Sequence, residues 1–182
     1  MIALAEGYGP REASGSPARR PRGPVTTLKT HAGYAGLPTR RVIVVTERTL
    51  VLIKPDAVRR RLVGELISRL ERKDLVIEAM ALRVMDSDLA DTHYAEHVAK
   101  PFYPTLKGFM TSGPLVSMII SGDSAIDVVR GLVGATDGRK AAAGTMRGDY
   151  SLSNTENLIH ASDSPDSAKR EIALWFPELD LA

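Results

Sequence analysis

Residues 49–73 read TLVLIKPDAVRRRLVGELISRLERK and contain the first clear structural pattern in the chain. TLVLIK is a short run of β-branched and aliphatic residues that Pro55 ends, which predicts a buried strand. From Leu62 to Lys73, apolar residues recur every three or four positions, which predicts a helix with one apolar face. The ordered part of the chain therefore opens with a strand followed by an amphipathic helix.

The same two patterns alternate through the rest of the sequence. We expect further strands at 76–85, 112–121 and 157–162, and further helices at 86–98, 101–110, 122–134 and 164–176. A glycine-rich stretch that is poor in bulky apolar residues, 134–151, predicts a long loop. This order suits an α+β fold, a ferredoxin-like sandwich with an antiparallel four-stranded sheet and helices covering one face.

Residues 1–45 differ in composition from the remainder of the chain. They are rich in Gly, Pro, Ser and Arg and lack hydrophobic periodicity, which predicts a disordered basic extension before a single domain at 46–182. A targeting or nucleic-acid-binding role for the extension stays open. Translation could also start at Val44 or Val45, in which case the extension is not part of the native protein.

Charge and composition narrow the function classes. Residues 1–45 carry 7 Lys and Arg against 2 Asp and Glu, whereas 46–182 carry 17 against 20, so the domain itself is mildly acidic. A nucleic-acid partner is therefore not expected. The lack of cysteine excludes disulfides and thiolate metal sites and fits a cytoplasmic protein. No apolar run approaches the ~20 residues of a membrane helix, so no membrane partner is expected.

The segment HYAEH at 93–97 is the first candidate site. It matches the H-x-x-E-H pattern, in which His93 and His97 could bind zinc with Glu96 as the base. The pattern is short and no third ligand can be identified. An amphipathic helix with polar histidines near the surface is the favoured interpretation.

The glycine-rich loop is the second candidate. It is not a P-loop, because neither Gly134 nor Gly138 is followed by Lys and then Ser or Thr. Arg130, Thr136 and Arg147 could converge on phosphate oxygens, since arginine forks match phosphate geometry. Taken alone, these side chains are better explained as solvated surface groups.

The third candidate surrounds His160 in NLIHASDS. A histidine in a short apolar strand is most often an ordinary core or surface residue. A neutral imidazole with a pKa of about 6.5 can nevertheless attack phosphorus when another group fixes its tautomer. Ser162 and Glu171 are candidates for that role, and nearby cations would offset phosphate charge.

Six segments together resemble the nucleoside diphosphate kinase family. They are TLVLIKPDAV, HYAEHVAKPFY, SGPLVSMII, GTMRGDY, NLIHASDS and REIALWFP, and the resemblance covers residues 46–182 in a bacterial, actinobacterial form. It implies transfer of a γ-phosphoryl group from a nucleoside triphosphate to a nucleoside diphosphate, by a ping-pong mechanism through phosphohistidine. It also implies a homo-oligomer, a tetramer or a hexamer. Mg²⁺ would be held mainly by nucleotide phosphates and water, with no direct protein ligand.

The resemblance assigns expected roles to the catalytic residues. His160 matches the phosphorylated histidine, and Glu171 and Ser162 match the residues that support its side chain. Tyr94 matches the tyrosine beside that histidine. Lys54 matches the lysine near the ribose and phosphates of the nucleotide.

The resemblance also assigns expected contacts to the nucleotide. Phe102 matches the aromatic residue on which the base stacks, a contact nearly indifferent to base identity. Asn157 matches the residue at the 3′-hydroxyl. The expected phosphate contacts are Arg130, Thr136 and Arg147.

Five positions depart from the pattern of the family. Gly138 and Ala143 stand where prolines are common in the long loop, which removes two restraints on φ. Ala161 replaces a common glycine and is tolerable if its φ stays negative. Ala57 also replaces a glycine, and Asn154 replaces an apolar residue beside the base.

Overall fold

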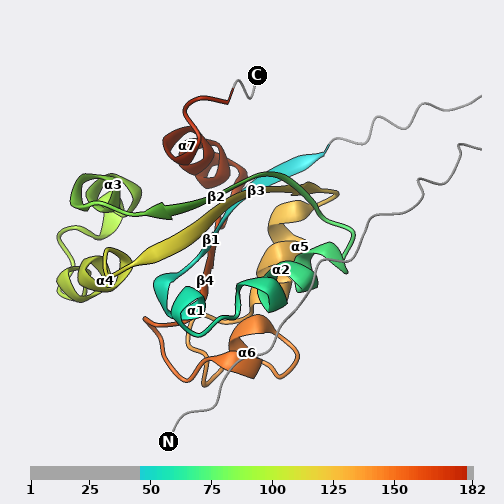
Figure 1. The fold of residues 1–182 in the computed structure, drawn as a ribbon, viewed down its shortest axis with the longest axis horizontal. Helices are drawn as coiled ribbons and strands as arrows, with labels where there is room; N and C mark the ends of the chain where they lie inside the picture. Colours follow the sequence, from blue (N-terminus) through green and yellow to red (C-terminus); the bar gives the residue numbers. More distant parts are fainter. Residues whose placement is uncertain (1–45, 180–182) are drawn as a thin grey trace, which may run out of the picture. The chain divides into compact units, whose positions relative to one another are not determined.

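The computed structural model describes residues 46–179, and Figure 1 shows how their helices and strands are arranged. The extension predicted at 1–45 lies outside the described residues, as do the last three residues of the chain. None of the helices among residues 46–179 is long and apolar enough to cross a membrane.

Four strands form one antiparallel sheet, as predicted. They are β1 Glu47–Ile53, β2 Val76–Val84, β3 Pro114–Gly122 and β4 Ile159–Ala161. Their order is β2-β3-β1-β4, so β1 and β3 are central and β2 and β4 are edges. In the register between β1 and β4, His160 lies opposite Leu52 at the centre of the three-residue strand.

The helices broadly follow the predicted pattern. The long ones are α2 Val63–Glu71, α3 Ser87–His93, α4 Tyr103–Met110, α5 Ala125–Val133 and α7 Pro165–Trp175. A 3₁₀ turn, η1 Ala95–His97, follows α3. Two further helices of five residues each, α1 Pro55–Arg59 and α6 Met146–Tyr150, were not predicted, because so short a helix shows no apolar periodicity.

The prediction that helices cover one face needs correction, because helices lie on both sides of the sheet (Figure 1). Val51 and Ile53 belong to one hydrophobic cluster, with residues of α2 and α5. Leu50 and Leu52 belong to a second, with residues of α3, α4 and α7. The run TLVLI is apolar at successive positions of both faces, and this pattern is typical of a strand buried on both sides.

Local signals fix the elements that carry the site. Ser164 is the N-cap of α7, where its side chain accepts a hydrogen bond from the Ser167 backbone N–H, and Pro165 follows at the first helical position. Gly134 caps the C-terminus of α5 and has a φ of 84°. A Cβ there would lie 2.4 Å from Thr145 Oγ1, so glycine is required both by conformation and by space.

Candidate active site

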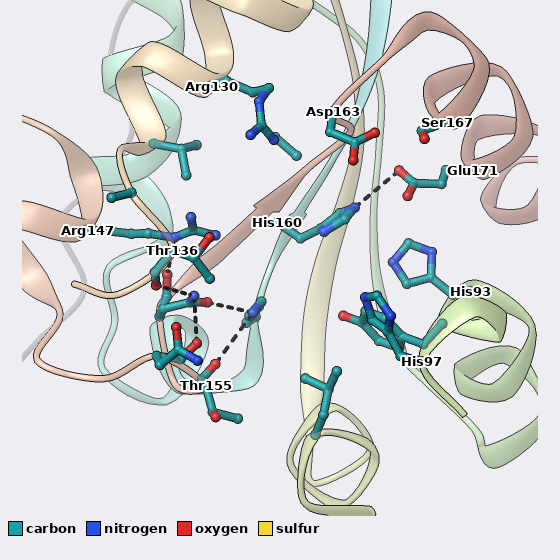
Figure 2. A pocket seen from close by; sticks show the side chains of 18 of the residues that line it. His93, His97, Arg130, Thr136, Arg147, Thr155, His160, Asp163, Ser167 and Glu171 are labelled. Carbon is teal, nitrogen blue, oxygen red and sulfur yellow. Dashed lines mark hydrogen bonds and ion pairs between the residues drawn. The ribbon is translucent and has the colours of Figure 1, made fainter. Parts of the chain in front are cut away.

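A cavity of about 510 Å³ lies where the ends of β1 and β4 meet α3, α5 and α7 (Figure 2). It brings together side chains that are far apart in the sequence. All but one of the predicted site residues line it: Lys54, Tyr94, Phe102, Arg130, Thr136, Arg147, Asn157, His160 and Glu171. Ser162 does not line it and lies fully buried beside Glu171.

His160 is held by a short chain of hydrogen bonds. Its Nε2 lies 3.1 Å from Glu171 Oε2, the same oxygen that accepts a 2.6 Å hydrogen bond from Ser162 Oγ. Ser162 Oγ in turn accepts from the Leu50 backbone N–H at 3.2 Å. Because a carboxylate only accepts, the imidazole proton sits on Nε2, which leaves the Nδ1 of His160 with a free lone pair.

Glu171 is suited to hold that tautomer. The carboxylate is 7% exposed, and this burial opposes its charge. Hydrogen bonds from His160 and Ser162 outweigh burial and keep the pKa of Glu171 below its ordinary value. Glu171 is therefore ionised at neutral pH and accepts the His160 proton.

Lys54 is a buried amine that pairs with no carboxylate of the described part of the chain. Its Nζ donates to Asn157 Oδ1 at 2.6 Å and to the Thr155 carbonyl at 3.5 Å. Burial, reinforced by Arg147 and only partly opposed by Asp56, lowers the pKa of Lys54 to about 7. An anion in the pocket would restore the charge of this amine.

Two arginines line the pocket in different ways. Arg147 is 9% exposed, and its side chain donates to three backbone carbonyls: Gly134 at 3.1 Å, Asn157 at 3.2 Å and Ile159 at 2.6 Å. It therefore ties the loop after α5 to β4, a structural task that the sequence did not indicate. The exposed side chain of Arg130 makes no hydrogen bond or ion pair with residues 46–179, so it is available to an anion.

Asn157 links the loop to the lysine. Besides accepting from Lys54, its side-chain amide donates to the Thr136 carbonyl at 2.8 Å and to the Asn154 carbonyl at 3.0 Å. Asn154 itself lines the cavity. The backbone that follows is strained, since Leu158 has a φ of 73°, which costs a non-glycine residue about 1–3 kcal/mol.

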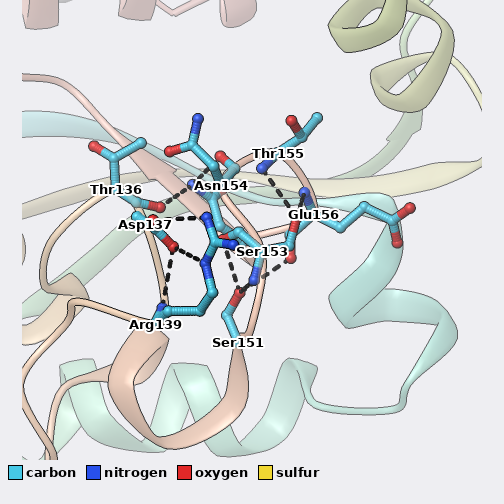
Figure 3. A network of polar contacts seen from close by, with 9 residues as sticks. Thr136, Asp137, Arg139, Ser151, Ser153, Asn154, Thr155 and Glu156 are labelled. Atoms are coloured by element: carbon cyan, nitrogen blue, oxygen red, sulfur yellow. Dashed lines mark hydrogen bonds and ion pairs between the residues drawn. The ribbon is translucent and has the colours of Figure 1, made fainter.

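Gly138, one of the loop residues that depart from the pattern of the family, makes a specific backbone contact. Gly138 N–H donates to the Ser153 carbonyl at 3.2 Å, a bond that proline could not make. Around it, Ser151, Ser153 and Glu156 exchange side-chain and backbone hydrogen bonds (Figure 3). Neither Ala161 nor Ala57 has a positive φ, so the strain that a missing glycine could have caused at these positions does not arise.

Aromatic side chains line the side of the cavity opposite the loop. Tyr94 is buried and stacks with His97 at a centroid distance of 6.2 Å. Phe102 is 51% exposed and meets the edge of His97 at 5.6 Å. Phe102 therefore presents an open ring at the mouth of the pocket.

The H-x-x-E-H pattern does not assemble as a zinc site. Among the described residues, the group of three histidines and acids whose ligand atoms lie within 4.8 Å of one another is His93, His160 and Glu171, and His97 is not part of it. The Nδ1 of His93 accepts a hydrogen bond from Trp175 Nε1–H at 3.2 Å. The neutral ring must then carry its proton on Nε2, which leaves no lone pair there for a metal.

A family model described as nucleoside diphosphate kinase matches residues 47–181. The chain belongs to the nucleoside diphosphate kinase family. It is accordingly a phosphotransferase, and the cavity with its cations and its histidine is of the kind that such an enzyme needs.

Individual members of the family are similar to this chain over nearly their whole length. A nucleoside diphosphate kinase of a Nocardioides species is 65% identical over 132 residues, which are 72% of this chain and 98% of that protein. The one from Mycobacterium tuberculosis is 58% identical over 134 residues, or 73% and 98%. The structure of the halophilic enzyme from Halobacterium salinarum in complex with CDP superposes with a TM-score of 0.70 at 48% identity, covering 71% of this chain and 87% of that one.

Proposed function

We propose that this chain transfers the γ-phosphoryl group of a nucleoside triphosphate to a nucleoside diphosphate by a ping-pong mechanism, with His160 as the phosphoryl carrier. One observation supports this most directly. His160 Nδ1 has a free lone pair in a cavity lined with cations, while its Nε2–H is held by Glu171.

In the first half-reaction, the lone pair of His160 Nδ1 attacks the γ-phosphorus. The bond to the bridging oxygen breaks, and the nucleoside diphosphate leaves with that electron pair. The ring becomes cationic, and its Nε2–H donates to the carboxylate of Glu171, which Ser162 holds in place. In the second half-reaction, a terminal phosphate oxygen of another nucleoside diphosphate attacks the same phosphorus and restores neutral His160.

Cations balance the charge that moves in both half-reactions. We assign this role to Lys54, Arg130 and Arg147, with the hydroxyl of Thr136 as a further donor. Arg130 has all of its donors available, and two of the five N–H groups of Arg147 remain after its three backbone bonds. Phosphoryl transfer depends on this kind of positioning and electrostatic stabilisation.

The rest of the nucleotide would lie toward the mouth of the cavity. The exposed ring of Phe102 offers a stacking face to any base, which supports broad specificity. We place the 3′-hydroxyl beside the Lys54–Asn157 pair and Tyr94 beside His160. Nucleoside tri- and diphosphates are thus the proposed partners.

Mg²⁺ is the proposed cofactor. It prefers several oxygen ligands and keeps its waters. The most deeply buried acid of the cavity, Glu171, is already engaged by two donors, and cations dominate the phosphate region. The chain therefore fits an ion held mainly by nucleotide phosphates and water, which would offset phosphate charge when bound.

We also propose a homo-oligomer in the cytoplasm, with no membrane or nucleic-acid partner. The edge strand β2 supports self-association, because three side chains on one of its faces are largely exposed although apolar: Met80, Leu82 and Val84, at 57%, 69% and 67%. An exposed apolar edge strand normally pairs with or packs against another chain. Both a tetramer and a hexamer are compatible with this.

Labelling with γ-³²P-ATP and Mg²⁺, followed by a quench, tests the mechanism. We expect a labelled protein whose label is labile to acid, stable to base and discharged by GDP. His97→Ala, a change at another histidine of the cavity, should still accept label, whereas His160→Ala should not. An unlabelled wild-type protein, or a labelled His160→Ala protein, would defeat the mechanism.

A further inference from the structure

His93 is a buried side chain that has no role in the phosphoryl-transfer mechanism proposed for this site. It ends α3 and is 8% exposed, beside His160 and Glu171 (Figure 2). Its Nε2 is buried and has no hydrogen-bond partner among residues 46–179. Buried polar groups are almost always paired, so an unpaired one next to reacting groups calls for an explanation.

The tautomer of His93 is set by a hydrogen bond at its other ring nitrogen, Nδ1. Trp175 Nε1–H, which can only donate, points at His93 Nδ1 from 3.2 Å. His93 Nδ1 must therefore accept, and the proton must sit on Nε2. Burial and, to a smaller extent, the neighbouring charge of His160 lower the pKa of His93 to about 3. The ring therefore stays neutral at physiological pH.

The unpaired donor lies next to the group that supports His160. The rings of His93 and His160 meet edge to face with centroids 4.9 Å apart, and a nitrogen of each lies within 4.8 Å of a Glu171 carboxylate oxygen. Glu171 Oε2 already accepts from His160 and Ser162, whereas Oε1 accepts from none of the described residues. A donor without an acceptor and an acceptor without a donor thus belong to neighbouring side chains, His93 and Glu171.

We propose that His93 is a positioning residue: Trp175 fixes its tautomer so that its Nε2–H supports the Glu171 carboxylate while His160 carries the phosphoryl group. This rests on the proposed role of His160. When the ring of His160 becomes cationic, Glu171 must stay ionised, and a third donor strengthens that state. The charged and titratable groups that act on His93 are His160 on β4, Glu171 and Arg170 on α7, and Lys54 after β1.

The first test determines the tautomer of His93. In protein labelled with ¹⁵N-histidine, long-range ¹H–¹⁵N NMR should show His93 only as the Nε2–H form, unchanged between about pH 5 and 8. Trp175→Phe, which keeps an aromatic ring but removes the donor, should release His93 into a mixture of tautomers. An Nδ1–H form in the wild type, or a His93 that titrates in this range, would overturn the proposal.

The second test measures the rate of His160 phosphorylation and its pH dependence. His93→Phe keeps a ring and removes the N–H, so the single-turnover rate of His160 phosphorylation should fall roughly threefold to tenfold, which is the value of one hydrogen bond. The pKa of Glu171 should rise without this donor, so the acid limb of the rate profile should move to higher pH. The dissociation constant for ADP should stay within about twofold, because one lost hydrogen bond to Glu171 leaves the nucleotide contacts in place.

Two further variants separate positioning from packing. Introduced alone, Trp175→Phe should slow phosphorylation. Added to His93→Phe, it should slow the reaction no further, because Trp175 acts through His93. Tyr103→Phe loses the hydroxyl of a buried tyrosine in the same hydrophobic cluster and should leave the pH profile unchanged. A loss in His93→Phe that is uniform with pH would mean packing alone and would overturn the proposal. Labelling in His160→Ala would instead overturn the phosphoryl-carrier role itself.

Discussion

Lys54 illustrates how a buried charge can be reserved for a ligand. Its amine has amide and carbonyl acceptors but no carboxylate among residues 46–179, and the cation Arg147 lies nearby. Near pH 7 the amine of the free protein is therefore close to its titration midpoint. In the proposed function, a nucleotide phosphate supplies the counter-ion of this amine. Binding and protonation of Lys54 are therefore linked.

This linkage predicts how ADP affinity depends on pH. Bound phosphate stabilises the charged amine, so the pKa of Lys54 rises above about 7 in the complex. Affinity should be constant well below pH 7 and should fall by up to about tenfold per pH unit above it, until the pKa of the complex is reached. Calorimetric titration with ADP from about pH 6 to 9 measures this. In Lys54→Met the dependence over this range should be much weaker, and an equal slope in both proteins would contradict the role given to Lys54.

Glu171 and Ser162 should differ in their importance to His160. Glu171→Gln removes the charge that offsets the cationic ring and should slow phosphorylation roughly 100-fold, the effect of losing a group that assists in proton placement. Ser162→Ala removes one neutral donor to Glu171 and should cost about fivefold. Rapid-quench measurement of the phosphoprotein gives both rates. The reverse order would mean that Ser162, and not Glu171, holds the ring.

Among the elements, the loop after α5 shows how glycine and arginine can replace the restraint of proline. Arg147 joins the loop to β4 through three backbone carbonyls, and Gly138 N–H closes a further bond to Ser153. The looser loop that was inferred from Gly138 and Ala143 is therefore tied down by other contacts. Composition alone could not show this, because the partners of Arg147 are main-chain atoms.

Gly138 should be intolerant of a side chain. A Cβ at this position would lie 2.4 Å from the Ser151 carbonyl oxygen, so Gly138→Ala must displace backbone and should cost about 1–3 kcal/mol in the free energy of unfolding. Gly131→Ala, in α5 with nothing within 4 Å, is the matched control and should be stabilising by about 0.5–1 kcal/mol. Urea titrations give both values. A neutral Gly138→Ala would show that Ser151 can move away.

For the molecule as a whole, the sequence was informative where the signal is local. The strands and long helices follow apolar periodicity, and NLIHASDS brings the phosphoryl-carrier candidate within two residues of Ser162. Helices on both faces could have been inferred from TLVLI, in which Leu50 and Val51 point to opposite cores. The pairing of His93 with Trp175 could not, because 82 residues separate them and neither neighbourhood hints at the other.

The exposed face of β2 leads to a prediction about assembly. Leu82 is 69% exposed in the single chain, so Leu82→Glu should change folding stability by no more than about 0.5 kcal/mol. In an interface formed by this strand, the same change would place unpaired carboxylates in an apolar contact. The variant should therefore keep the wild-type circular dichroism spectrum while its mass by sedimentation equilibrium falls. Thr92→Glu, an exposed position on α3, should keep the wild-type mass. An unchanged mass for Leu82→Glu would move the contact between chains away from β2.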